Sequence, residues 1–236
     1  MSDILTIEKL PVEVLQQIFI FSSNHNFCLV SRTFYQVVTT QSSVKTYWLL
    51  HKYNYNYKQV LNRGLKWKFF NKDILLQLDH LYYQSQQSNS ELAKPATFIP
   101  YNERPIPSRL LSKPDPDGKA YELVKILLER GASPDEPQGY PLMKSASLGR
   151  LDMARLLLSY KANGSICVND YSPMVISVGK NNFDMVKLLV EYGVKPDEKS
   201  LEISVKMNLR EITQFLLDHG AVPNRNVIAA IHNDTS

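Results

Sequence analysis

The sequence has few cysteines and no uninterrupted apolar run long enough to cross a membrane. Cys28 and Cys167 are the only cysteines in 236 residues, lie 139 positions apart and form no CxxC motif. This spacing excludes a disulfide framework and the ligand spacing of a zinc finger. The apolar runs stop well short of the roughly 18 residues that suggest a transmembrane helix.

The N-terminus also lacks the basic and apolar regions of a signal peptide. We therefore expect a reducing compartment, cytoplasmic and/or nuclear, in which the two cysteines stay unpaired. The sequons at Asn163 and Asn233 are then expected to carry no glycan.

Motifs for catalysis and cofactor binding are missing as well. The sequence contains no GxGxxG, GxxxxGK[ST], GxSxG or HExxH. Its five histidines are scattered, and the pair His25 and Cys28 has no further metal ligands nearby. We predict a protein that is not an enzyme, with no catalytic residue, no cofactor and no metal site.

Four similar segments occupy the C-terminal half. Each has a run of apolar-rich residues followed by a turn, and their first residues are 30, 32 and 27 positions apart: LVKILLERGASPD from Leu123, MARLLLSYKANGS from Met153, MVKLLVEYGVKPD from Met185 and ITQFLLDHGAVPN from Ile212. A period near 30 is typical of a helical solenoid, a class of protein that binds partners.

The ends of these segments have the composition of helix ends. Gly131, Gly193 and Gly220 close three of the four, and glycine adopts the left-handed conformation of a helix C-cap without strain. Lys161 stands at this place in the second segment, ahead of Asn163-Gly164, so we expect an altered turn there.

A shorter segment precedes each of the last three helices. In register within these segments are the small residues Ser145, Ser177 and Ser204, which allow close helix packing, and then a turn residue: Gly149, Asn181 or Asn208. Glycine and asparagine tolerate positive φ best, so a helix–turn–helix unit is predicted. The first unit is expected to lack its first helix, because PDPDG from Pro114 occupies that place.

Residues 120 to 230 resemble ankyrin repeats, whose consensus is TPLHxAAxxGHxEVVxLLLxxGAxxN. The resemblance is carried by Pro141-Leu142, Ala146, Gly149, Pro173, Gly220-Ala221 and Asn224, whereas Met143, Val175 and Glu202 replace the consensus histidine. It implies a target-binding face made of polar loops and of the exposed side of each first helix. The residues that map to this face are Gln138, Tyr140, Ser147, Leu148, Asn169, Tyr171, Lys180, Lys206 and Met207. A non-ankyrin helical bundle is the alternative.

The N-terminal residues predict two helices. Leu10-Pro11 precedes VEVLQQIFIF, in which Val14, Leu15, Ile18 and Phe19 share one side, and FCLVSRTFYQVV follows a polar break. Helices totalling about 30 residues bury too little surface to be stable alone. They therefore need a neighbour in this chain or in another.

The pattern LPxEVLxxIF…LVSRxFYxVV resembles the F-box, with a shorter region between its helices. This resemblance implies docking on the Skp-type adaptor of a cullin-RING ubiquitin ligase. An F-box ahead of ankyrin repeats is also a pairing known in fungal-type proteins. The implied contacts are Leu10, Pro11, Val14, Leu15, Ile18, Leu29, Val30, Ser31 and Phe34. The alternative is a helix pair that packs on the helices after it.

Residues 41–72 are basic and aromatic. They contain seven Lys/Arg and no Asp or Glu, and tyrosine, tryptophan and phenylalanine are interleaved with the cations. One interpretation is a site for single-stranded nucleic acid. We favour amphipathic helices with a turn at Gly64, in which the rings form core and the lysines face solvent, and we interpret them as a degenerate extra repeat that connects the N-terminal helices to the linker.

The expected fold is all-α: F-box-like helices at 1–40, a basic helical connector at 41–82, a Pro/Gln/Ser-rich linker or loop at 83–118 and ankyrin-like repeats at 119–236. The expected function is target recognition within an SCF-type ubiquitin ligase, with a Skp-type adaptor and a target protein as partners and no membrane. The alternatives are an ankyrin scaffold without a ligase role and a nucleic-acid-binding protein that uses residues 41–72.

Overall fold

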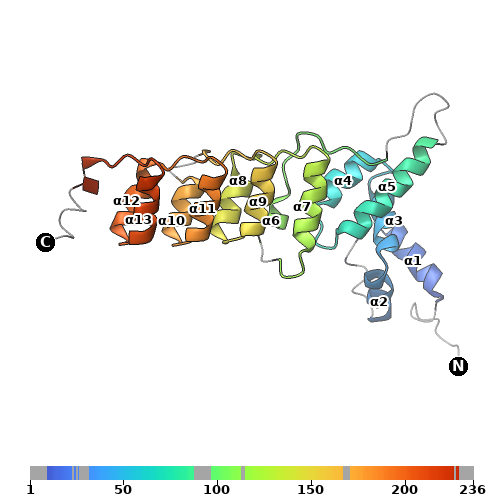
Figure 1. The fold of residues 1–236 in the computed structure, drawn as a ribbon. Helices are drawn as coiled ribbons and strands as arrows, with labels where there is room; N and C mark the ends of the chain where they lie inside the picture. The colour runs from blue at the N-terminus through green and yellow to red at the C-terminus, as the bar shows by residue number, and fades with distance from the viewer. Residues whose placement is uncertain are drawn as a thin grey trace. The chain divides into compact units, whose positions relative to one another are not determined.

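The computed structural model describes residues 10–22, 24, 26, 32–87, 97–112, 115–166, 171–225 and 227–228. These residues form helices and no strand, apart from an isolated bridge between Pro105 and Ser133, so the predicted all-α class is confirmed for them. The chain divides into two compact units, Met1–Pro100 and Tyr101–Ser236 (Figure 1). Each unit is described by itself.

The described part of the first unit is built around one central helix. α3 packs against α1, α2, α4 and α5 and buries Trp48, Leu49 and Leu50 completely. The N-terminal helices thus have the neighbour that their small size requires. The bounds are α1 Val12–Phe21, α2 Arg32–Thr40, α3 Ser42–Lys52, α4 Tyr57–Gly64 and α5 Lys72–Gln87.

Aromatic side chains form the core of this unit. The Trp48 ring stacks on Phe19, with centroids 5.8 Å apart, and meets Trp67 edge to face at 5.3 Å. The Trp48 Nε1–H donates to the carbonyl of Ser22 at 2.9 Å, which satisfies its polar group. Gly64 ends α4 against the Phe70 ring, and an added Cβ there would lie 2.9 Å from that ring.

The second unit contains two rows of helices. α8, α10 and α12 pack side by side in one row, and α7, α9 and α11 do so in the other. Each first helix is joined by a short turn to its second helix, and the pairs stack in a line (Figure 1). The bounds are α6 Ser108–Leu111, α7 Lys119–Glu129, α8 Tyr140–Ser147, α9 Leu151–Ser159, α10 Pro173–Gly179, α11 Phe183–Glu191, α12 Glu198–Lys206 and α13 Arg210–Asp218.

Side-chain caps begin several of these helices. The Ser172 hydroxyl accepts from Val175 N at 3.1 Å at the start of α10, where Pro173 has no N–H to satisfy. Asn182 caps α11 in the same way through Met185 N, and Asp197 caps α12. These short residues therefore set where each helix starts.

Left-handed residues make both kinds of turn. Between first and second helices, φ is +67° at Gly149, +52° at Asn181 and +54° at Asn208, as predicted. After the second helices, φ is +88° at Gly131, +64° at Lys161, +82° at Gly193 and +92° at Gly220. The expectation of an altered turn at Lys161 was wrong, because the helix packing on either side imposes the same conformation on a lysine.

The three serines in register are buried between helices. The hydroxyls of Ser145 and Ser177 donate to the carbonyls of Pro141 and Pro173 one turn earlier, at 2.8 and 2.6 Å. Ser204 donates to Leu201 and accepts from Thr213. Each small side chain satisfies its own polar group, so the helices approach without an unpaired hydroxyl.

Residues 83–118 were expected to be a linker or loop, and the described ones among them are partly helical and partly packed. α5 continues to Gln87, and α6 packs against both α7 and α8, where a first helix would lie. The prediction that the first pair lacks a first helix was therefore wrong, since one turn of helix forms ahead of PDPDG. The buried side chains of this segment are Ile99, Tyr101, Ile106, Leu110 and Leu111.

Two titratable side chains of residues 101–112 are enclosed by this packing. The Tyr101 hydroxyl donates to the carbonyl of Pro105 at 3.0 Å, and burial raises the pKa of this phenol although Arg104 opposes the shift. Burial also lowers the pKa of the Arg109 guanidinium. The prolines limit the length of α6 but do not keep the segment in solvent.

Candidate protein-interaction surfaces

The turns between helices place one row of exposed side chains on neighbouring repeats. Leu148, Lys180 and Met207 follow α8, α10 and α12 at equivalent positions, each one residue before a left-handed turn residue. Leu148 is 38% exposed and Met207 46% exposed. All three were predicted target contacts, and the structure brings them into one row.

A second row lies on the first helices themselves and was missed by the sequence analysis. Lys144, Ile176 and Ile203 directly precede the three buried serines and are partly exposed. Their position in the repeat register was the signal that could have identified them. Ile176 and Ile203, together with Leu148 and Met207, form an apolar surface on the first helices and the turns after them. Lysines are interspersed on this surface.

One ion pair lies on the same face. Lys206 Nζ is 2.6 Å from Glu202 Oε1, one turn apart on α12. This hydrogen bond and the Lys206 charge lower the pKa of the Glu202 carboxyl. Glu202 occupies the place of the consensus histidine, so an exposed ion pair replaces that side chain here.

The other predicted target contacts lie at the edges of this face. Tyr140 begins α8 and Ser147 ends it, and both are partly buried. Gln138, with φ of +47°, and Tyr171 are exposed in the connecting loops. Asn169 lies outside the described residues.

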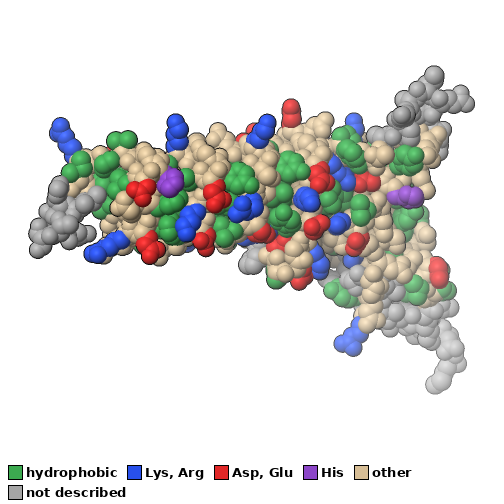
Figure 2. Space-filling view, viewed as in Figure 1, with side chains coloured by type: hydrophobic (Ala, Val, Ile, Leu, Met, Phe, Trp, Pro, Cys, Tyr) green, Lys and Arg blue, Asp and Glu red, His purple; other side chains and the backbone are tan. Residues whose placement is uncertain are grey.

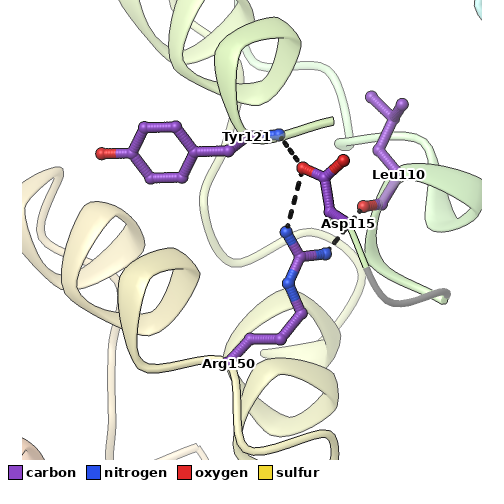
Figure 3. Close-up of polar contacts among 4 residues, drawn as sticks. All are labelled: Leu110, Asp115, Tyr121 and Arg150. Carbon is purple, nitrogen blue, oxygen red and sulfur yellow. Dashed lines mark hydrogen bonds and ion pairs between the residues drawn. The ribbon is translucent and has the colours of Figure 1, made fainter. Parts of the chain in front are cut away.

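A buried ion pair fixes the start of the array (Figure 3). Arg150 Nη2 lies 3.5 Å from Asp115 Oδ2, and the two side chains are only 9% and 10% exposed. Arg150 also donates to the Leu110 carbonyl at 3.3 Å, while Asp115 accepts from Tyr121 N at 2.8 Å. The pair thus joins α6, the first turn of α7 and the turn between α8 and α9.

The first unit presents an apolar flank on α1. Leu15 and Phe19 point into the core, at 1% and 2% exposed, so Leu15 is not available as an adaptor contact. Val14 is 41% exposed and Ile18 is partly exposed.

The remaining predicted adaptor contacts are placed only in part. Leu10 is partly exposed and Pro11 exposed at the start of α1. Phe21, which was not predicted, is 61% exposed at its end. Leu29, Val30 and Ser31 lie outside the described residues, as does the side chain of Phe34 in α2.

An open pocket of about 350 Å³ lies beside the loops before α10 and α12, where the Ser172 hydroxyl donates to Asp197 Oδ2 at 2.8 Å. No group of three metal-ligating side chains occurs among the residues that the structure describes, and none of their helices is both long and apolar enough to span a bilayer. Acidic and basic side chains are interspersed over the visible face of the repeats (Figure 2).

Stacked helix pairs with left-handed turns define a helical repeat protein, and comparison with known families specifies the repeat. Residues 116–200 match the family model of ankyrin repeats in three copies. Residues 8–39 match the model described as the YDR249C N-terminal domain. The chain therefore contains ankyrin repeats, which are modules for protein–protein interaction.

One viral relative shares part of the chain. The ankyrin repeat protein FPV240 of fowlpox virus is 33% identical over 67 residues. The match covers 28% of this chain and 16% of the viral protein. No solved structure matches the chain significantly.

Proposed function

We propose that this chain is the substrate-recognition subunit of an SCF-type cullin-RING ubiquitin ligase. The observation that carries the proposal is the apolar flank of α1, which opens on Leu10-Pro11 and leaves Val14 and Phe21 in solvent. Exposed apolar side chains gathered on one flank of a helix are typical of a protein-docking surface. In this proposal the flank binds a Skp-type adaptor.

The extent of the N-terminal family match supports this division of roles. Residues 8–39 match a family model separate from that of the repeats, and they coincide with the F-box-like pattern. The ankyrin repeats in the second unit then hold the target through Leu148, Lys180, Met207 and the partly exposed isoleucines beside them.

This chain would perform no covalent chemistry in that role. It would raise the effective concentration of the target near the catalytic partners of the ligase. The proposal places the protein in the cytoplasm and/or the nucleus, where cullin-RING ligases work.

The test is affinity purification of the full chain with a Skp-type adaptor, using a matched pair of variants on α1. Val14→Asp places a charge on the proposed flank and should weaken adaptor binding about tenfold or more. Val12→Asp is the control, because Val12 is equally exposed, at 44%, on the opposite flank of the helix. Leu15 is not used, since its substitution would disturb the core.

A plain ankyrin scaffold is the second candidate, favoured by the ankyrin match at residues 116–200, which by itself indicates a role in protein–protein interaction. It predicts that the chain captures a target but no Skp-type adaptor. Failure of the wild-type chain to bind any such adaptor would overturn the ligase role and leave the scaffold.

A further inference from the structure

A cluster of cations and rings lies in the first unit, on α3, α4 and the connection to α5. We define the cation–ring cluster as Lys52 and Tyr53 at the end of α3, Arg63 on α4, and Lys66, Trp67 and Lys68 in the connection to α5. Arg63, Lys66 and Lys68 are exposed. Neither the adaptor nor the target proposed above uses these residues.

The rings hold two of these cations in place. Lys52 Nζ lies 4.9 Å from the Trp48 centroid and 5.8 Å from the Trp67 centroid. The Arg63 guanidinium lies 5.8 Å from the Tyr53 ring, and Trp67 Nε1–H donates to the Tyr53 hydroxyl at 3.3 Å. Cation–π contact and this hydrogen bond therefore bring together side chains from three segments.

The described residues of the first unit carry a net positive charge. The described residues of the first unit include eight Lys/Arg and three Asp/Glu, and one of the acids, Asp79, is buried and accepts from Ile99 N. Between Gln41 and Lys72 no acidic residue occurs. A positive surface of this kind attracts an anionic partner.

The packing of the rings around the cations favours one kind of anion. Single-stranded nucleic acid binds through successive bases stacked on free ring faces. Here Trp48 is fully buried, Trp67 stacks on Phe69 at 5.8 Å with an interplanar angle of 26°, and Tyr53 carries Arg63. The rings that lie nearest the cations contact these cations or other rings. We therefore do not expect these rings to stack on bases.

We propose that the cation–ring cluster binds an acidic peptide segment of a partner protein. Arg63 would offer its planar fork to one carboxylate, and Lys66 and Lys68 would meet neighbouring carboxylates as point charges. Because ring contacts already restrain Lys52 and Arg63, less side-chain entropy is lost on binding. The proposal is independent of the ligase role.

The test measures binding of a fluorescein-labelled oligoglutamate peptide to the full chain by fluorescence anisotropy at low salt. The variant Arg63→Gln/Lys66→Gln/Lys68→Gln should bind about tenfold or more weakly, as expected for several exposed ion pairs lost together. All three side chains are exposed, so the variant should keep its fold and thermal melting should match wild type.

The control removes the same total charge elsewhere. Lys125→Gln/Lys187→Gln/Lys195→Gln changes three exposed lysines of the second unit and should alter binding less than about threefold. A single Arg63→Lys variant keeps the charge and loses the fork, so we expect about two- to threefold weaker binding.

Three outcomes would overturn the proposal. The first is no binding of the peptide at low salt. The second is an equal loss in the control, which would mean that net charge alone attracts the peptide. The third is tighter binding of an oligo(dT) probe that the same three substitutions abolish, which would assign the cluster to nucleic acid.

Discussion

Asp115 and Arg150 are charged side chains enclosed where three elements meet. Each has a second partner, the Tyr121 amide for Asp115 and the Leu110 carbonyl for Arg150. Removing one charge leaves the other buried without compensation, which costs more than the pair contributes. The two residues are 35 positions apart, and no sequence pattern predicted that they would form an ion pair.

Arg150→Met should lower the free energy of unfolding by about 3 kcal/mol, because the Asp115 carboxylate stays buried without its cation. Urea denaturation followed by circular dichroism measures this. Asp115→Asn in the Arg150→Met background should recover part of the loss.

Arg155→Met is the matched control. Arg155 and its partner Glu191 lie 3.9 Å apart and are 60% and 61% exposed, so less than about 1 kcal/mol should be lost. Equal effects at Arg150 and Arg155 would contradict the structural role of the buried pair.

The exposed pair of Glu202 and Lys206 gives a pH prediction. Lys206 lowers the pKa of Glu202, so the folded state prefers the charged carboxylate. Its stabilising effect is present above the pKa in the unfolded chain and is lost as pH falls through the lower pKa of the folded state. Lys206→Met should raise the Glu202 pKa, which an NMR titration of the side-chain carboxyl reports; an unchanged pKa would show that the contact is absent in solution.

At the scale of elements, α6 is the clearest difference between expectation and structure. Its four residues lie among prolines, so no helical period is visible in the sequence. Leu110 and Leu111 are nevertheless 4% and 1% exposed, because the first pair of the array needs apolar cover. Tertiary packing therefore explains why this helix forms, whereas local helix propensity does not.

Leu111→Ala tests that role. Truncating a fully buried leucine should cost about 2–5 kcal/mol in the free energy of unfolding. The control is Leu148→Ala, since that side chain is 38% exposed and should cost about 0.5 kcal/mol or less. Similar small losses in both denaturation curves would mean that α6 does not pack on the repeats.

Other elements were predictable to different degrees. The turns at Asn181 and Asn208 followed from residue type alone, because positive φ favours asparagine and glycine. Lys161 did not follow, since its conformation is imposed by its surroundings. On α1 the sequence grouped Val14 with Leu15, and the packing of α3 separated them into exposed and buried.

The candidate surfaces depended even more on tertiary structure. Ile176 and Ile203 look like core residues in the sequence, because an apolar side chain in a helix is usually buried. Their partial exposure appears only when α8, α10 and α12 lie side by side. The exposed row at Leu148, Lys180 and Met207 was predictable, because the turn residue beside each fixes the register.

At the scale of the whole molecule, two units with separate cores imply separate stability. A fragment of residues 101–236 should remain helical and unfold cooperatively, because it retains α6 and the Asp115–Arg150 pair. A fragment of 119–236 lacks both and should unfold at a clearly lower urea concentration. Circular dichroism of the two fragments decides this, and equal midpoints would contradict the unit boundary at Pro100 and Tyr101.

The left-handed residue between paired helices affects how the number of repeats in such a chain can change during evolution. The main contacts of α10 and α11 are with each other and with the helices of the neighbouring pairs. A duplicated segment that starts after Asn181 and ends at Asn208 would begin and end at the same backbone conformation. Gene duplication could therefore extend the array by whole pairs while every existing interface kept its geometry.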